Sequence, residues 1–248
     1  MKDFVRRFLT AVQFLTRFPV HRTGFRQDDL SKSAAFFPLI GLLLASGGLL
    51  LHFALVGRVS NAVVVVLVLL YLVLITGGLH EDGLADAADG FGGGWDKEQA
   101  LAIMRDSRIG SYGAIAISLS LLGRFVFLTD LTPEKFTPYF VAGQVLSRWT
   151  AVPLSFFLRS ARAGTGQGSL VAGKISWPSL IAATLLAFGI AAAFLNAKLV
   201  WPGLTVLCVA VITGLYYQKR LGGITGDCLG ASIQLAEIGV YLTGVLIH

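Results

Sequence analysis

Residues 61–79 read NAVVVVLVLLYLVLITGGL and contain no charged side chain. In a soluble protein the repeated valines would favour a β-strand. In lipid, however, a run of this length must satisfy its own backbone hydrogen bonds, which a single segment achieves as a helix. About 20 apolar residues suffice to cross a bilayer. The stretch therefore predicts a transmembrane helix and decides the class of protein.

The rest of the chain has the same character. Of its 248 residues, 55% are hydrophobic and 14% are charged, whereas soluble domains contain about 25% charged residues. Disorder requires low hydrophobicity and high charge, so this composition excludes it. Cys208 and Cys228 are too few for a disulfide scaffold. We therefore expect an integral membrane protein.

We predict an all-α, polytopic helical bundle that forms a single domain over residues 1–248, with about seven transmembrane helices. The interior charges Arg124, Arg148 and Glu237 should face the centre of the bundle, where either ion pairing among them or a ligand would satisfy them. The predicted segments are 34–56, 61–79, 112–129, 137–158, 178–197, 199–217 and 229–247.

The distribution of positive charge predicts the orientation. Lys and Arg concentrate before residue 34 and in every second loop after it, whereas the alternate loops contain only Arg58, Lys135 and Lys198. Positive residues favour the cytoplasmic side. We therefore expect a protein of the cytoplasmic (inner) membrane with its N-terminus inside and its C-terminus outside. The net charge of +6 follows from this topology, so no nucleic-acid partner is predicted.

Residues 1–33 form a basic amphipathic segment. Within it, Phe4, Phe8, Val12, Leu15 and Phe18 recur at helical spacing, with Arg side chains on the other faces. The charges interrupt the apolar core that a signal peptide needs. Two arrangements fit this pattern: a helix lying on an anionic leaflet of the lipid bilayer, or a helix packed on the cytoplasmic side of the protein itself. The basic residues are Lys2, Arg6, Arg7, Arg17, Arg22, Arg26 and Lys32.

Half of the 14 acidic residues lie within 80–111, HEDGLADAADGFGGGWDKEQALAIMRDSRIGS, which we expect to be a cytoplasmic catalytic loop. Asp82, Asp86 and Asp89 have the spacing i, i+4, i+7, which on a helix places three carboxylates on one face. These carboxylates repel each other unless a cation bridges them. Oxygen ligands without Cys favour Mg²⁺ or Mn²⁺ over zinc. A solvated acidic surface is the alternative, but acidic groups at a membrane boundary are costly and favour a functional site.

Other polar groups lie near this cluster or in later loops. Arg105 and Arg108 carry guanidinium groups that can bind phosphate, although anchoring on the positive side of the membrane also explains them. Asp227 lies in a glycine-rich segment, which alone would be read as a turn. His80 adjoins the acidic cluster and is a candidate ligand or acid–base group. No P-loop, nucleophile elbow or zinc spacing is present.

Two motifs together resemble the signature of the cobalamin synthase family, the adenosylcobinamide-GDP ribazoletransferases. They are GGLHEDGLADAADG (Gly77–Gly90) and IMRDSRIGSYG (Ile103–Gly113). Four shorter matches keep the same order and extend the resemblance over nearly the whole chain. These are FLTRFPV (Phe14–Val20), FPLIG (Phe37–Gly41), SRW (Ser147–Trp149) and LGGITGDCLGA (Leu221–Ala231).

The resemblance implies a Mg²⁺-dependent membrane enzyme of cobalamin assembly. Members join adenosylcobinamide-GDP to α-ribazole or α-ribazole 5′-phosphate and release GMP. No activated Ser, Cys or His nucleophile is evident, which favours direct transfer. The oligomeric state is left open.

The resemblance also implies roles for individual residues. Glu81, Asp82, Asp86 and Asp89 would hold one or two Mg²⁺ across the donor diphosphate. Arg105, Ser107 and Arg108 would bind phosphate, with Asp106 orienting them or joining the metal ligands. His80, a metal-site carboxylate or Asp227 would accept the proton of the ribazole hydroxyl. Thr225 and Arg148 are the remaining candidate substrate contacts.

Two other classes of membrane protein are alternatives. CDP-alcohol phosphotransferases also use clustered Asp-Gly carboxylates, and residues 86–90 match the opening of their pattern. However, Gly93 and Gly94 stand where that pattern has Ala-Arg. A cation transporter lined by Arg124, Arg148 and Glu237 would place its carboxylates near the middle of the membrane, whereas the cluster found here is predicted to lie in a cytoplasmic loop.

Overall fold

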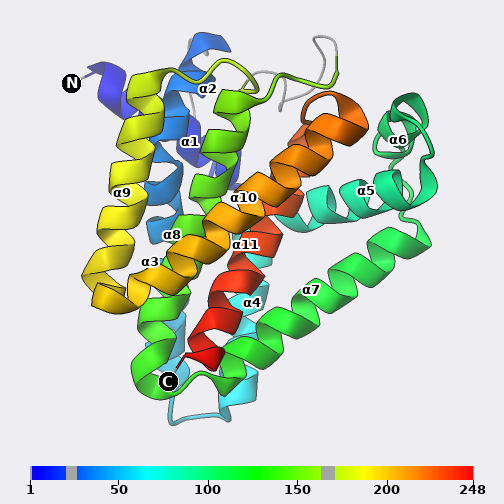
Figure 1. Ribbon diagram of the computed structural model, residues 1–248. Helices are drawn as coiled ribbons and strands as arrows, with labels where there is room; N and C mark the ends of the chain where they lie inside the picture. The colour runs from blue at the N-terminus through cyan, green and yellow to red at the C-terminus, as the bar shows by residue number, and fades with distance from the viewer. Residues whose placement is uncertain (1, 21–26, 163–170, 248) are drawn as a thin grey trace.

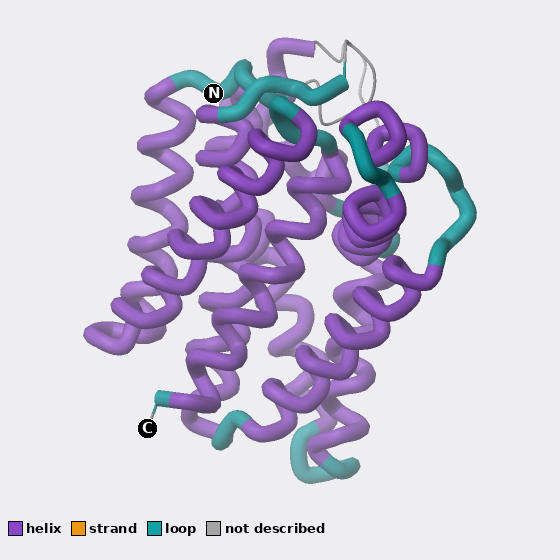
Figure 2. Tube along the Cα trace, turned by 45° about the vertical axis from the view of Figure 1, so that its right-hand side comes forward, coloured by secondary structure: helices purple, strands orange, loops and turns teal. Residues whose placement is uncertain are grey.

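The computed structural model describes residues 2–20, 27–162 and 171–247, and every regular element within these ranges is a helix (Figures 1 and 2). The all-α prediction is therefore confirmed. His21, Arg22 and Arg26 lie outside the described residues. The elements are α1 (Lys2–Leu15), α2 (Gln27–Ser33), η1 (Ala34–Phe36), α3 (Phe37–Leu55), α4 (Asn61–Thr76), α5 (Leu79–Gly93), α6 (Lys97–Ile103), α7 (Ser111–Asp130), α8 (Pro133–Phe157), α9 (Trp177–Leu195), η3 (Asn196–Leu199), α10 (Val200–Leu221) and α11 (Gly226–Leu246).

A helix occupies each of the seven predicted ranges, and several of these helices have the length and hydropathy of a membrane span. Within the described residues, four helical stretches qualify, and the bent pair α4–α5 makes a fifth if it is counted as one span. α8 is not among them. It carries Gln144 and Arg148 but is buried along most of its length, so other helices and not lipid surround its polar groups. The four stretches are Asp29–Leu55, Ser111–Asp130, Trp177–Leu221 and Gly226–Leu246.

The two ends of the chain lie at opposite ends of the bundle (Figures 1 and 2). The turns α3–α4, α7–α8 and α9–α10 lie towards the end that carries the C-terminus (Figure 1). These turns, or the residues beside them, contain Arg58, Lys135 and Lys198, the three cations expected on the outer side. The three cations of the alternate loops therefore lie towards the same end of the bundle.

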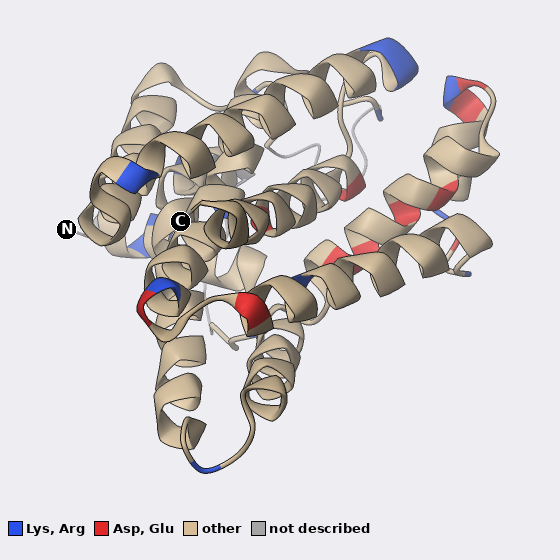
Figure 3. Ribbon diagram, turned by 60° about the horizontal axis from the view of Figure 1, so that its bottom comes forward, with Lys and Arg blue, Asp and Glu red and all other residues tan. Residues whose placement is uncertain are grey.

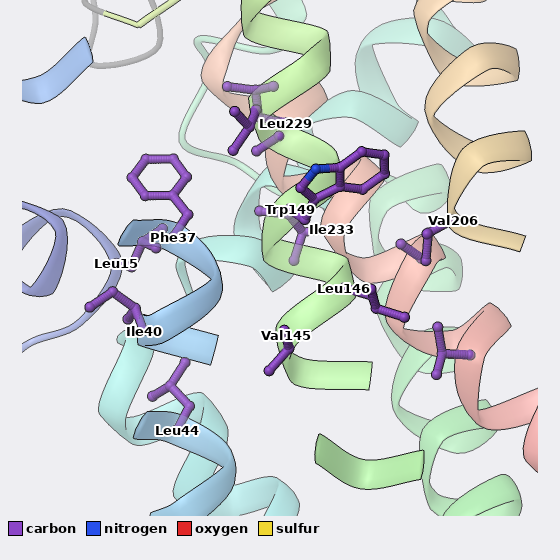
Figure 4. Packing of buried hydrophobic residues seen from close by; sticks show 14 of the residues in the cluster. Leu15, Phe37, Ile40, Leu44, Val145, Leu146, Trp149, Val206, Leu229 and Ile233 are labelled. Carbon is purple, nitrogen blue, oxygen red and sulfur yellow. The ribbon is translucent and has the colours of Figure 1, made fainter. Parts of the chain in front are cut away.

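The hydrophobic core centres on α8, which packs against α3, α9 and α11. A side chain on Gly41 of α3 would collide with the α8 backbone at Gln144, and one on Gly143 of α8 would collide with Tyr241 of α11. Small residues therefore let these helices approach closely, as is common in membrane bundles. Figure 4 shows part of this packing, with Leu15, Phe37, Ile40, Leu44, Val145, Leu146, Trp149, Val206, Leu229 and Ile233 labelled.

The outer faces of α3, α4, α7, α9 and α10 carry exposed apolar side chains. Leu50 and Leu185 are 74% and 69% exposed. In water such continuous apolar surfaces would drive association, whereas in a bilayer they are the favoured exterior. Further examples are Phe53, Val66, Leu74, Leu119, Leu122, Ile181, Val211 and Leu215.

A sharp bend separates α4 from α5. Gly77 and Gly78 both adopt left-handed backbone conformations, with φ of 67° and 69°, which glycine reaches without steric cost. The helix axes consequently differ by 84°. The range 80–111, described above as a loop, is therefore mostly helical, because α5 and α6 form within it. Acidic residues recur along α5 (Figure 3).

Helix α1 packs on the protein itself, the second of the two arrangements considered for it. Ala11 and Leu15 are buried, and the rings of Phe14 and Phe37 stack with centroids 5.7 Å apart. Phe4 and Phe18 remain exposed. This helix therefore covers one end of the bundle close to α3.

Candidate active site

A cavity of about 210 Å³ lies where α1, α3, α5, α8 and α11 meet. Phe14, Leu15 and Phe37 are among its apolar walls. Its polar lining comes from three parts of the chain: α5, the segment after α8 and the start of α11. The polar residues are His80, Asp82, Ser160, Arg162, Thr225 and Asp227.

Two glycines bring the acidic residues of α5 and α11 together. A side chain on Gly83 would come within 3.1–3.2 Å of the α11 backbone at Asp227 and Gly230. The two helices therefore touch through glycine at this crossing. Asp86, one turn after Asp82, interacts electrostatically with both Asp82 and Asp227. Three carboxylates from two helices thus share one region, where Asp227 joins Asp82 and Asp86 of the predicted α5 cluster.

The segment after α8 adds a cation that the sequence analysis missed. The amide of Ile224 donates to the carbonyl of Arg159, and that of Ala161 donates to the carbonyl of Ile224, both at 2.9 Å. This short pairing fixes the segment beside α11. Arg162 Nη2 then donates to Asp227 Oδ2 at 3.0 Å. In the sequence, Arg162 lies in one of the loops whose positive charge predicts the orientation, and no motif marks it.

Thr225 supports this geometry. Its Oγ1 accepts from the Cys228 amide at 3.2 Å, which caps α11, and donates to Asp227 Oδ2 at 3.1 Å. Side-chain caps of this kind stabilise helix starts by about 1 kcal/mol. The predicted substrate contact Thr225 therefore lines the cavity and also orients Asp227.

His80 is buried at the cavity, with 3% of its surface exposed. Its Nε2 has no hydrogen-bond partner among the described residues. A buried polar atom without a partner is costly, and here it borders a space large enough for part of a ligand. The predicted acid–base candidate is thus in a position to contact a ligand.

Asp89 lies towards α7 and binds the start of that helix. Its Oδ2 accepts from the Gly110 amide at 2.7 Å and its Oδ1 from the Gly113 amide at 2.8 Å. A negative charge at a helix N-terminus is favourable because it satisfies unpaired amides and opposes the helix dipole. Asp89 therefore connects α5 to α7.

Glu81 faces a buried charge network between α5, α7, α8 and α11. Its Oε1 accepts from Arg124 Nη2 at 2.9 Å and from Gln234 Nε2 at 3.0 Å. Arg124 Nη1 also lies 3.5 Å from Glu237 Oε1, and Arg148 Nη1 donates to Glu237 Oε2 at 2.8 Å. Ion pairing thus explains the three interior charges. Arg148, predicted as a substrate contact, is almost fully buried in this network and does not line the cavity.

The predicted phosphate-binding segment borders a second cavity, of about 500 Å³, at the other end of α5. Asp89, Asp106 and Arg108 line it. Arg108 binds Asp106 with Nη2 to Oδ2 at 2.6 Å and holds the pKa of that carboxyl at about 2. Ser107 and Arg105 are exposed beside it. Asp82 and Asp89 are seven residues apart, so the two cavities are separated by about 10 Å along α5.

The donor set fits magnesium bound together with a substrate. Among the described residues, no three His, Cys, Asp or Glu side chains converge as a ready-made metal site. Mg²⁺, however, usually takes one or two carboxylates and completes its coordination with water and substrate phosphates. Asp82 and Asp86, one turn apart on α5, supply that number of oxygen ligands.

Comparisons with known proteins identify the relatives of this chain. The family described as cobalamin-5-phosphate synthase matches residues 7–245. A Clostridium botulinum (strain Okra / Type B1) protein named adenosylcobinamide-GDP ribazoletransferase is 33% identical over 249 residues, covering 100% of both chains. A protein of the same name from Ralstonia nicotianae is 38% identical over 250 residues, covering 96% of this chain and 94% of its own.

A third protein of that name, from Shewanella pealeana, is 38% identical over 244 residues and covers 95% of this chain and 93% of its own. No solved structure matches the chain significantly. The family match extends over α1 to α11 and includes every element that lines the cavity. The chain therefore belongs to the cobalamin-5-phosphate synthase family.

Proposed function

We propose that this protein transfers the adenosylcobinamide phosphate group from adenosylcobinamide-GDP to α-ribazole or α-ribazole 5′-phosphate and releases GMP. Relatives with the corresponding name match over 94% and 100% of their length. The observation that carries the proposal is the cavity where Asp82, Asp227, His80 and Arg162 meet. These groups supply what a diphosphate donor and a hydroxyl acceptor need: metal ligands, a cation and a proton acceptor.

In the proposed reaction, the acceptor hydroxyl oxygen forms a bond to the phosphorus that carries adenosylcobinamide. The bond from that phosphorus to the oxygen of the GMP phosphate breaks, and the hydroxyl proton passes to a base. His80, with its unpartnered Nε2, and Asp227 both line the cavity and are the proposed bases. Because no covalent intermediate is needed, the transfer is direct.

Asp82 and Asp86 are the proposed ligands of Mg²⁺, or of Mn²⁺ in its place. When bound, the ion neutralises negative charge on the diphosphate and on the leaving GMP. Glu81 and Asp89, predicted as further ligands, have oxygens that already accept hydrogen bonds from Arg124 and from α7. We assign these two a supporting role: they hold α5 so that Asp82 and Asp86 keep their places.

The second cavity gives the remaining predicted contacts a role. Adenosylcobinamide-GDP is long, and a donor with its diphosphate near Asp82 would extend along α5. Arg105, Ser107 and Arg108 would then contact its distant part, with Asp106 orienting Arg108 through their ion pair. Thr225 would act by orienting Asp227, and Arg148 by supporting the network behind α5.

We further propose a location in the cytoplasmic membrane with seven crossings and with the N-terminus and cavity on the cytoplasmic side. Support comes from the positive charges and from the opposite placement of the termini (Figure 1). In a background with Cys208 and Cys228 replaced by Ser, an impermeant maleimide should label R58C on intact cells. It should label R105C only after permeabilisation. The reverse pattern would invert the topology.

The activity is tested with the full-length protein purified in detergent. GMP release from adenosylcobinamide-GDP is measured with and without α-ribazole 5′-phosphate, and with Mg²⁺ or EDTA. We expect release only when acceptor and metal are both present, together with formation of the joined corrinoid. Release without acceptor would argue against direct transfer. No release from folded protein would refute the proposed activity, and CDP-diacylglycerol would be the next donor to test.

A further inference from the structure

We propose that Arg162 is the cation that binds the donor diphosphate in the cavity between α5 and α11, and that Asp227 holds the guanidinium of Arg162 until the diphosphate takes the place of Asp227. This inference rests on the proposed function, because a diphosphate donor is what the cavity would admit. Among the described residues that line the cavity, Arg162 is the only Lys or Arg. The sequence assigned phosphate binding to Arg105 and Arg108, but Arg108 borders the other cavity, about 10 Å away along α5.

The guanidinium of Arg162 is positioned for this role. Its side chain is 14% exposed, and Nη2 donates to Asp227 at 3.0 Å. Its Nε–H is buried and has no partner among the described residues. Arginine presents five N–H donors in a planar fork and binds phosphate oxygens in pairs. The geometry therefore leaves an unused donor beside the cavity that a phosphate oxygen can satisfy.

Asp227 is a suitable temporary partner because its environment is already negative. It interacts electrostatically with Asp82, and Asp86 interacts with both of these carboxylates. Without Arg162, three carboxylates would repel one another in a half-buried site. When a diphosphate takes over the guanidinium, Asp227 becomes uncompensated and the site favours a cation. Binding of diphosphate and of a divalent cation should therefore strengthen each other, as linkage requires.

The backbone of the segment that carries Arg162 is fixed, so the Arg162 side chain can exchange Asp227 for a phosphate without a change in the fold. Its backbone pairs with Ile224 through two hydrogen bonds of 2.9 Å. A side chain on Gly223 would collide with the carbonyl of Arg159. The segment after α8 and the segment before α11 are therefore in direct contact. Only the side chain of Arg162 needs to turn from Asp227 to the ligand.

The inference is tested by binding of GDP and of pyrophosphate to full-length protein in detergent, measured by titration calorimetry with and without Mg²⁺. R162A should weaken binding about 10- to 100-fold, the range for loss of a charge-assisted hydrogen bond. R162K should lose less, because it keeps the charge without the fork. R159A removes an exposed cation from the same segment and should bind as the wild type does.

The variant D227N distinguishes exchange from a purely structural ion pair. In EDTA, D227N should bind GDP more tightly than the wild type, because Asp227 no longer competes for Arg162. If D227N and R162A weaken binding equally, or if R162A binds normally, the inference is overturned. The melting temperature of each variant reports folding, and R162K serves where R162A does not fold.

These outcomes separate the inference from the proposed function. A wild-type protein that binds GDP through Arg162 but releases no GMP from the donor would refute the transferase activity alone. A protein that transfers normally, with equal donor KM and equal GDP affinity in the wild type and R162A, would refute the inference alone. Absence of binding of both GDP and pyrophosphate by folded wild-type protein would also overturn the inference.

Discussion

At the scale of residues, the acidic side chains of α5 have different contacts because they point in different directions. Successive residues of a helix are about 100° apart around its axis. Asp82 lines the cavity, whereas its neighbour Glu81 meets Arg124 in the bundle interior. Asp89 reaches the start of α7. Four carboxylates that look equivalent in the sequence therefore divide into two groups. Glu81 and Asp89 accept hydrogen bonds from other parts of the chain, and Asp82 and Asp86 are the proposed metal ligands.

Replacement of Asp82 and Asp86 tests the metal assignment. D82N and D86N preserve size but remove the charges that a divalent cation needs. Turnover should fall at least about 100-fold in each variant, and raising the Mg²⁺ concentration should restore part of it. The measurement is initial rate against Mg²⁺ concentration. E98Q, which changes an exposed carboxylate on α6, is the matched control. Normal turnover in the double variant D82A/D86A would exclude the assignment.

The pair Asp106–Arg108 gives a prediction about pH. Hydrogen bonds from Arg108 lower the pKa of Asp106 from 3.8 to about 2. The carboxylate is therefore charged at pH values above 3.8. Any contribution of the pair to stability is present above about pH 4 and is lost as the pH falls towards 2. In R108A the pKa of Asp106 should rise towards 3.8, as measured by NMR titration of the labelled carboxyl carbon. An unchanged pKa would show that the pair does not form.

At the scale of elements, α5 is positioned from both ends. The left-handed residues Gly77 and Gly78 turn it away from α4 at its start. Near its end, Asp89 binds the amides of Gly110 and Gly113. A side chain on Gly113 would collide with that carboxylate, so glycine is required at this contact. The direction of α5, and with it the place of Asp82 and Asp86, depends on these local contacts.

Removal of the Asp89 carboxylate separates a structural role from metal binding. D89A leaves two amides at the start of α7 without their acceptors and should reduce the free energy of unfolding by about 1–3 kcal/mol. D89N keeps one acceptor and should lose less. Thermal unfolding in detergent measures both variants. If both unfold at the wild-type temperature but have lost Mg²⁺-dependent activity, Asp89 is a metal ligand after all.

At the scale of the whole molecule, the network of Glu81, Arg124, Arg148 and Glu237 joins four helices behind the cavity. Two positive and two negative groups balance one another in the buried interior. Gln234, Ser120, Gln144 and Tyr241 extend the network by hydrogen bonds. Such a network favours one arrangement of α5, α7, α8 and α11, because a shifted helix would leave a buried charge unpaired.

Removal of one charged group of this network should lower the stability of the protein more than removal of both partners of an ion pair. R124M leaves Glu81 without its cation and should lower stability by about 3–5 kcal/mol. Adding E81Q should recover part of that loss, because the unpaired charge is then removed. Unfolding of the single and double variants, compared as a double-mutant cycle, gives the coupling. Additive losses would mean that the two groups do not interact in the folded protein.

The sequence by itself determined the helical membrane class, the positions of the long apolar helices, the unequal distribution of cations among the loops and the acidic cluster. These features depend on composition and on local periodicity, which neighbouring residues set. The family resemblance also came from contiguous motifs. For the same reason the sequence indicated Asp82, Asp86, His80 and Asp227 as candidates, because each lies within or beside such a motif.

Only the tertiary structure decided how these candidates are combined. The approach of Gly83 to Gly230 brings Asp227 to the carboxylates of α5. Asp82, one of these carboxylates, lies 145 residues before Asp227 in the sequence. The pairing of residues 159–161 with Ile224 brings in Arg162, which no motif marked. The 84° bend makes α5 cross the bundle, so that Glu81 and Asp89 meet partners on other helices. The physical reason is that charge pairing in three dimensions depends on which helices touch, and spacing along the chain does not contain that information.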